Sequence, residues 1–235
     1  MLKMSPNSII QTPLLRFLTE FRSASTTNYL YSLTSMQKRI FIVHGWDGSP
    51  QNCWFPWLKN KLEEKGFFVE APAMPNPEIP EVKSWVSCLR NAVGETDENT
   101  YFVGHSIGCQ TILRYIEQLP AESRVGGVVC VAGFFRLLHL ETDEEKEIAK
   151  PWLETQMDFE KIKKHTNKII AIFSDDDPDV DLGDKELFKT YLNAKTIVEH
   201  RKGHFSDDAG IKELSSALEA VLEIAGEKSH PEAVA

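Results

Sequence analysis

Short apolar runs that alternate with amphipathic helical segments are the feature that most restricts the fold of this chain. An apolar run of four or five residues is typical of a strand buried on both faces of a parallel sheet. We expect strands over residues 40–43, 67–71, 101–103, 125–132, 169–173 and 196–199. The 3.6-residue periodicity between them predicts helices over 57–65, 82–93, 107–119 and 212–224. Strands and helices that take turns predict a mostly parallel sheet with helices on both faces.

One segment, residues 134–166, does not follow this alternation. It contains the acidic run ETDEEKE and the helical-looking stretch PWLETQMDFEKIKKH. In open sheets of this kind, ligands bind outside the carboxyl ends of the strands. We expect this segment to cross over that edge as a small lid.

Composition limits the classes of partner. The chain has 235 residues, of which 42% are hydrophobic, which is enough for one domain with a full core. The net charge of −9 argues against nucleic acid as a partner. No stretch of 18 apolar residues is present, so we expect no membrane span. The composition names no protein partner.

The beginning of the chain differs from the remainder. Residues 1–35 carry a charge of +2 from Lys3, Arg16 and Arg22 against Glu20. This segment is expected to be a disordered or cleaved extension, either translated upstream of a start at Met36 or a mitochondrial transit peptide rich in Ser and Thr. One α/β domain is then expected over 36–226, followed by a tail over 227–235.

The four cysteines form no CxxC pair, so we expect free and mostly buried thiols. Such thiols favour a reducing compartment and a cytoplasmic location, with the mitochondrion as the alternative.

The stretch YFVGHSIGCQ places Ser106 between Gly104 and Gly108, where a predicted strand becomes a predicted helix. This is the G-x-S-x-G pattern, in which a sharp turn exposes a serine hydroxyl at the carboxyl edge of the sheet. Small residues are needed two positions before and after the serine because the turn packs tightly. The pattern predicts a nucleophile at Ser106.

An acid and a base follow at the ends of later strands. The strand over 169–173 runs into SDDDP, and His204 lies in the loop after the last strand. The order serine, acid, histidine is typical of this kind of site. His204 is the predicted base, and Asp177 or Asp176 is the predicted acid that orients it.

Two backbone N–H groups are expected to stabilise an oxyanion at this site. One belongs to Ile107, directly after the serine, and the other to Trp46 in the loop after the first strand. The alternative for that loop is a tight turn at Gly45 and Gly48, with Trp46 used only in packing. No metal is expected, because Leu182 and Phe188 replace the Gly and Glu that a calcium loop starting at Asp177 requires.

These pieces resemble the small α/β-hydrolases of the retinoblastoma-binding protein 9 and YdeN type. The matching stretches are IFIVHGWDGSP, WFPWLKNKLEEKGFFVEAPAMPNP, YFVGHSIG, FSDDDP and KGHF, between about residues 39 and 222. The resemblance implies an α/β-hydrolase fold, with Ser106 as nucleophile, Asp177 as acid, His204 as base, and Gly45 and Trp46 in the oxyanion loop. The LxCxE motif of retinoblastoma recognition is absent from this chain.

The expected function is that of a serine hydrolase that cleaves small carboxylic esters through an acyl-enzyme, without a cofactor. Alternatives are a thioesterase, a small aminopeptidase or amidase with the same triad, and a non-catalytic binding protein with this fold. We expect Trp46, Trp54, Phe134 and Phe135 to line the site. Trp57 and Trp85 lie at helical spacing and are expected in the core.

Overall fold

The computed structural model describes residues 37–227. The predicted extension over 1–35 and residues 228–235 of the predicted tail lie outside the described residues, so the proposed division of the chain stays a prediction. No helix within the described range is long and apolar enough to cross a membrane.

Six strands form one sheet in the order β2-β1-β3-β4-β5-β6, and every neighbouring pair is parallel. The strands are β1 (Arg39–Val43), β2 (Phe68–Glu70), β3 (Thr100–His105), β4 (Gly127–Val131), β5 (Ile169–Ser174) and β6 (Lys195–Glu199). All six predicted strands are present, with shifted ends. The order reverses between β1 and β3, so the carboxyl ends of these strands border a crevice suited to a ligand.

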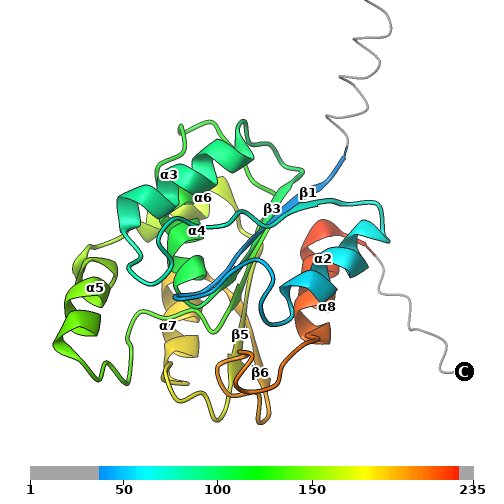
Figure 1. Ribbon diagram of the computed structural model, residues 1–235. Coiled ribbons are helices and arrows are strands. Elements are labelled where there is room, and N and C mark those ends of the chain that lie inside the picture. Colours follow the sequence, from blue (N-terminus) through cyan, green and yellow to red (C-terminus); the bar gives the residue numbers. More distant parts are fainter. Residues whose placement is uncertain (1–36, 228–235) are drawn as a thin grey trace, which may run out of the picture. The chain divides into compact units, whose positions relative to one another are not determined.

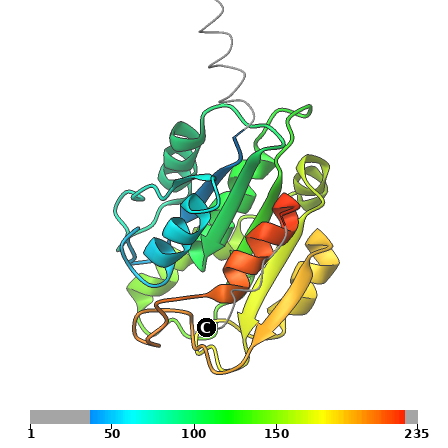
Figure 2. The same cartoon turned by 90° about the vertical axis from the view of Figure 1, so that its right-hand side faces the viewer.

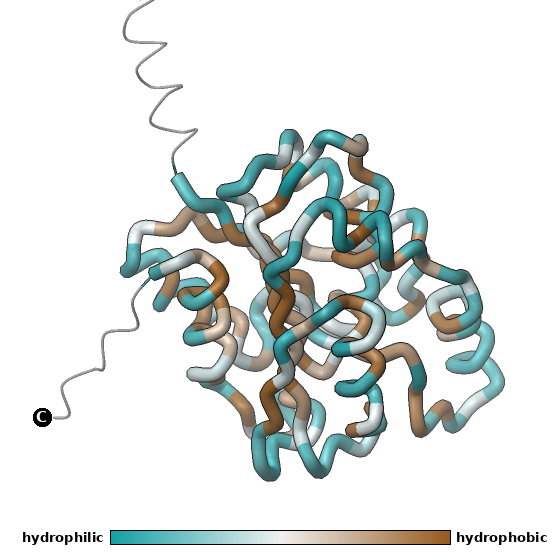
Figure 3. Tube along the Cα trace, turned by 180° about the vertical axis from the view of Figure 1, so that it is seen from behind, coloured by the Kyte–Doolittle hydropathy of each residue, from teal (hydrophilic) through white to brown (hydrophobic). Residues whose placement is uncertain are grey.

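Helices cover both faces of the sheet, as predicted. On one face lie α2 (Phe55–Glu63) and α8 (Ser215–Ala225), and on the other lie α3 (Val82–Val93), α4 (Ile107–Glu117), α6 (Phe159–His165) and α7 (Asp184–Leu192) (Figures 1 and 2). Each face has its own hydrophobic cluster. Hydrophobic residues accordingly concentrate along the central strands (Figure 3).

The segment over 134–166 contains two separate helices, α6 and α5 (Asp143–Glu154). The acidic run is the first turn of α5, where carboxylates are favoured by the positive end of the helix dipole. Thr142 and Glu145 form a capping box at this end. The stretch that looks like one helix is therefore split, and Asp158 begins α6 by accepting from the amide of Lys161.

Two buried charged side chains anchor this segment to the rest of the fold. Arg114 of α4 donates to the carbonyls of Trp152 and Thr155, at 2.8 and 2.9 Å. The fully buried carboxylate of Asp184 accepts from the backbone N–H of Arg136 at 3.0 Å and pairs with its guanidinium at 2.6 Å. Both ends of the segment that precedes α6 are thus held in place, which gives the carboxyl edge of the sheet a defined wall.

Candidate active site

Ser106 lies at the sharp turn between β3 and α4. Its backbone has φ 53° and ψ −122°, a conformation that costs a residue with a side chain about 1–3 kcal/mol. The residue occupies the N-cap position of α4, yet its side chain makes no capping hydrogen bond. The backbone N–H donates instead to the carbonyl of Val131 at 2.9 Å. The strained turn therefore leaves the hydroxyl free at the carboxyl edge of the sheet.

The two flanking glycines are required by packing around this turn. A Cβ at Gly104 would lie 2.7 Å from the amide nitrogen of Cys109, and a Cβ at Gly108 would lie 2.3 Å from the carbonyl oxygen of Val43. Both distances are shorter than any real carbon contact. The G-x-S-x-G spacing thus has a structural cause here, which is the close approach of α4 to β1 and to the turn itself.

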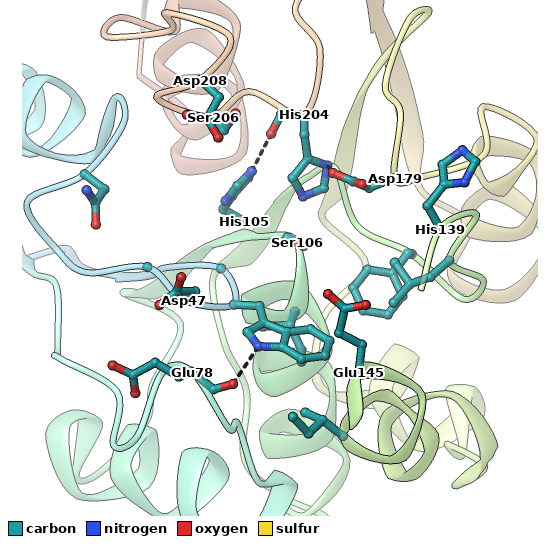
Figure 4. A pocket seen from close by; sticks show the side chains of 18 of the residues that line it. Asp47, Glu78, His105, Ser106, His139, Glu145, Asp179, His204, Ser206 and Asp208 are labelled. Atoms are coloured by element: carbon teal, nitrogen blue, oxygen red, sulfur yellow. Dashed lines mark hydrogen bonds and ion pairs between the residues drawn. The ribbon is translucent and has the colours of Figure 1, made fainter. Parts of the chain in front are cut away.

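His204 lies in the loop after β6, and its ring faces Asp177 after β5. The Nδ1 atom is 3.0 Å from each carboxylate oxygen of Asp177, whose side chain is only 2% exposed. A carboxylate can only accept, so Nδ1 carries the proton and Nε2 is left as an acceptor. Among the residues with described coordinates, neither His204 Nε2 nor Ser106 Oγ has a hydrogen-bond partner. Both residues border one cavity (Figure 4).

The two aspartates before Asp177 have a different task, because they hold the backbone of the loop that carries His204. Asp175 accepts from the N–H of Arg201 at 3.0 Å, and Asp176 accepts from the N–H of Gly203 at 2.9 Å. The sequence left Asp176 and Asp177 open as the acid. In the structure it is Asp177 that contacts the imidazole.

The loop after β1 is tied to the segment before α3. Neutral His44 makes one of these ties, since its Nε2 accepts from the N–H of Met74 at 3.0 Å, while its Nδ1–H donates within the loop to the carbonyl of Gly45 at 2.8 Å. Burial lowers the pKa of His44, which keeps this ring neutral. The indole of Trp46 adds another tie by donating to the carbonyl of Glu78 at 2.9 Å (Figure 4).

Two backbone donors remain available beside the serine. Within the described part of the chain, the N–H groups of Trp46 and Ile107 have no hydrogen-bond partner. Gly48 does close a turn onto Gly45, at 3.3 Å, so the loop is a tight turn as well as a source of a donor. Whether these two groups bind an oxyanion stays a prediction.

A cavity of about 890 Å³ opens above Ser106. Trp46 and Phe134 line it as predicted, and Phe55 lines it without having been predicted. The prediction is wrong for Trp54 and Phe135, which are absent from the lining.

Core packing explains both errors. Trp54 is fully buried among core residues, with its indole donating to the carbonyl of Phe205. The ring of Phe135 turns away to pack against Phe159, Phe188 and Tyr191. Trp85 lies in the hydrophobic cluster of one sheet face, as predicted, and half-buried Trp57 packs against the cluster of the other face.

The charge of the cavity lining is one-sided. Its carboxylates are Asp47, Glu78, Glu144, Glu145, Asp179, Asp207 and Asp208, and no Lys or Arg of residues 37–227 belongs to the lining. The whole chain has 26 basic and 35 acidic residues, so this wall is more acidic than the protein as a whole. Glu145 reaches toward the cavity from α5 (Figure 4). Negative potential of this kind favours cationic or neutral ligands over anions.

Other reactive groups near the serine have structural explanations. Cys53 borders the cavity, but burial raises the pKa of its thiol to about 11, so it stays protonated and is a poor nucleophile. Donor atoms of Asp177, Asp179 and His204 lie within 4.8 Å of one another, a spacing that a metal ion could use. Asp177 accepts from both His204 Nδ1 and the backbone N–H of Asp179, and these hydrogen bonds account for that closeness without an ion.

A parallel α/β sheet with a strained serine turn and a histidine–aspartate pair at its carboxyl edge defines the α/β-hydrolase class. A family model described as serine hydrolase matches residues 40–223, and the chain belongs to this family. The sequence is 32% identical to YdeN of Bacillus subtilis (strain 168) over 179 residues, which cover 76% of this chain and 92% of YdeN. It is 27% identical to serine hydrolase RBBP9 of Rattus norvegicus over 155 residues, covering 66% and 78% of the two chains.

Solved structures agree with the fold. The crystal structure of the B. subtilis ydeN gene product superposes with a TM-score of 0.75 and 29% identity, covering 81% of this chain and 100% of that one. Est1E of Butyrivibrio proteoclasticus, bound to ferulic acid, gives a TM-score of 0.63 at 16% identity over 80% and 87% of the two chains. The predicted α/β-hydrolase fold and family resemblance are confirmed, and membership of the serine hydrolase family supports hydrolase activity.

Proposed function

We propose that this serine hydrolase cleaves small carboxylic esters through a triad of Ser106, His204 and Asp177. The observation that carries this proposal is the bidentate approach of Asp177 to His204 Nδ1 at 3.0 Å, on the rim of the cavity that contains Ser106. In this arrangement Nε2 accepts the hydroxyl proton while Oγ attacks the ester carbonyl carbon. The negative oxygen that develops is bound by the free N–H groups of Trp46 and Ile107.

The remaining steps return the enzyme to its starting state. The tetrahedral adduct collapses, the bond to the alcohol oxygen breaks, and His204 gives its proton to the departing alcohol. Water then attacks the acyl–Ser106 ester, with His204 as base, and releases the carboxylic acid. Asp177 stabilises the imidazolium during both halves of the cycle. All proton transfers use groups of this chain, substrate and water.

A fluorophosphonate probe tests this mechanism, because it reacts with activated serines. Wild-type protein should be labelled, and Ser106→Ala should abolish labelling while the thermal unfolding midpoint stays close to that of wild type. Equal labelling of the alanine variant would remove Ser106 from the mechanism. A folded wild-type protein that is never labelled would favour the alternative of a non-catalytic binding protein.

A second candidate is a hydrolase for amine-bearing acyl groups, including small aminoacyl amides. The one-sided acidic lining of the cavity favours this candidate. The same lining disfavours a thioesterase acting on polyanionic thiol esters, because its excess of carboxylates repels them.

Three p-nitrophenyl esters of matched shape separate these possibilities: 4-(trimethylammonio)butyrate, its neutral analogue 5,5-dimethylhexanoate, and the anionic glutarate. A preference for the cation that fades with added salt would support the second candidate. Equal rates for the cationic and neutral esters would instead support the first proposal, an esterase without a preference for amine-bearing acyl groups.

A further inference from the structure

His105, the residue directly before the nucleophile, contacts the loop that carries the base. Its Nε2 atom lies 2.7 Å from the backbone carbonyl oxygen of His204 (Figure 4). A carbonyl can only accept, so Nε2 carries the hydrogen and His105 is the donor. The two imidazole rings also pack together, with centroids 4.9 Å apart.

The surroundings of His105 hold its ring in one position. It is 5% exposed and packs edge-on against Trp54, at a centroid separation of 6.2 Å, and at an angle against Phe55, at 5.8 Å. Burial lowers its pKa to about 3, so the ring is neutral and adds no positive charge next to His204. A neutral donor is suited to this place because a cation would oppose the imidazolium that forms on the base.

The loop that carries His204 needs such support, since its backbone is unusual. Arg201, Gly203 and Phe205 all have positive φ, at 54°, 51° and 54°. The carboxylates of the acidic turn after β5 accept from N–H groups of this loop, but they cannot donate to its carbonyls. The carbonyls of His204 and Phe205 therefore need donors from other parts of the fold. Within the described structure, the carbonyl of His204 is bound by His105 and that of Phe205 by the indole of Trp54, at 3.2 Å.

The oxyanion loop touches the same ring. A Cβ at Gly45 would lie 2.9 Å from Nδ1 of His105 and 3.3 Å from Cβ of Ser106. His105 therefore contacts three separate segments: the nucleophile turn to which it belongs, the loop after β1, and the loop of the base.

We propose that His105 is a positioning residue that sets the separation of Ser106 and His204 by bonding the backbone of the base to the end of β3. This inference rests on the proposed triad. In the described structure Ser106 and His204 form no hydrogen bond with each other, so their approach depends on the scaffold. A misplacement of about 1 Å at a catalytic group can cost on the order of 100-fold in rate.

Two amide substitutions of His105 form a matched test. His105→Gln keeps a donor near the position of Nε2, whereas His105→Asn moves it to the position of Nδ1 and out of reach of the His204 carbonyl. With p-nitrophenyl butyrate, we expect His105→Asn to lower kcat about 10- to 100-fold with little change in KM, and His105→Gln to recover most of that loss.

Trp54→Phe is the control for a general loosening of the loop, because it removes the neighbouring bond to the carbonyl of Phe205 and still leaves an aromatic ring to pack against His105. Unfolding free energies of all variants are measured in urea. Positioning by His105 is refuted if both amide variants keep wild-type kcat, or if Trp54→Phe lowers kcat as much at an equal loss of stability. Failure of the probe to label Ser106 in wild type would instead refute the proposed triad, and the inference with it.

Discussion

Asp177→Asn and Asp176→Asn make the same chemical change at adjacent positions, but the contacts of the two side chains predict very different effects on turnover. Asp177 accepts from the imidazole of His204 through both oxygens at 3.0 Å. Asp176 accepts from the hydroxyl of Ser174 at 2.7 Å and from the N–H of Gly203 at 2.9 Å, away from the ring. We expect only the substitution at Asp177 to disable turnover.

The size of the effect follows from the charge that forms on His204 during catalysis. Two unit charges about 4 Å apart at an effective dielectric constant of about 20 attract by about 4 kcal/mol. Loss of that attraction in the transition state corresponds to about a 1,000-fold lower rate. The side chain of Asp177 is 2% exposed, so solvent screens this interaction weakly. With the added loss of tautomer control, we expect kcat to fall about 10²- to 10⁴-fold.

Asp176→Asn is a sensitive control because its partners survive the substitution. The amide oxygen of asparagine can still accept from Ser174 and Gly203, so the loop keeps both hydrogen bonds. We expect kcat within about threefold of wild type and a small loss of stability.

The assay is kcat for p-nitrophenyl butyrate, paired with the rate of fluorophosphonate labelling at Ser106 and with unfolding in urea. The urea series shows whether a slow variant is still folded. If Asp176→Asn is the slower enzyme while both variants are folded, the assignment of the acid to Asp177 is refuted.

Four further outcomes follow from the same geometry. The pKa of buried His105 is about 3 against an ordinary 6.5, so the folded state takes up this proton later than the unfolded chain. The stability that neutral His105 provides is complete above pH 6.5, and the free energy of unfolding falls by about 1.4 kcal/mol per pH unit as the pH drops from there toward 3. Urea titrations at pH 7 and pH 5 should therefore show a smaller difference in unfolding free energy between the two pH values for His105→Gln than for wild type. Gly108→Ala should cost at least about 1–3 kcal/mol, seen as a lower urea midpoint, because its Cβ meets the Val43 carbonyl at 2.3 Å. Ser106→Gly should be more stable than Ser106→Ala by about 1 kcal/mol in the same assay, since glycine relieves the positive φ of 53°. Deletion of residues 1–35 should leave kcat unchanged, because the matched family segment begins at residue 40, and a folded but inactive truncated protein would contradict this.

The alternation of strands and helices could be predicted because each strand of this sheet is buried on both faces and thus reads as an apolar run. Helix α7 was missed, since its first turn, Asp184–Glu186, follows the loop-like stretch DPDVDLG and looks solvated. In the fold, the carboxylate of Asp184 is fully buried and accepts hydrogen bonds from the backbone N–H groups of Phe135 and Arg136 after β4. A contact between residues almost 50 positions apart leaves no local pattern in the chain.

The position of the candidate site along the chain could be predicted from the sequence, but the directions of the side chains around it could not. Pattern and spacing identify Ser106, an acidic turn and His204, because each lies at the end of a strand. They cannot show which of the three adjacent aspartates contacts the imidazole and which bind the loop backbone, since that depends on the direction of each side chain in the turn. They also cannot separate Phe134, which faces the cavity, from Phe135, which faces α7, because both are apolar neighbours.

The hydroxyl of Ser106 and Nε2 of His204 are both without partners among the described residues, and this has an energetic meaning. A serine at an N-cap normally stabilises its helix by about 1 kcal/mol through a side-chain bond. Here that bond is absent and backbone strain is added, so the rest of the fold must compensate for both costs. Ser106 and His204 thus border one cavity, while neither Oγ nor Nε2 has a hydrogen-bond partner among the described residues. Their hydrogen-bonding capacity stays available for the transition state, where an interaction absent from the ground state increases kcat.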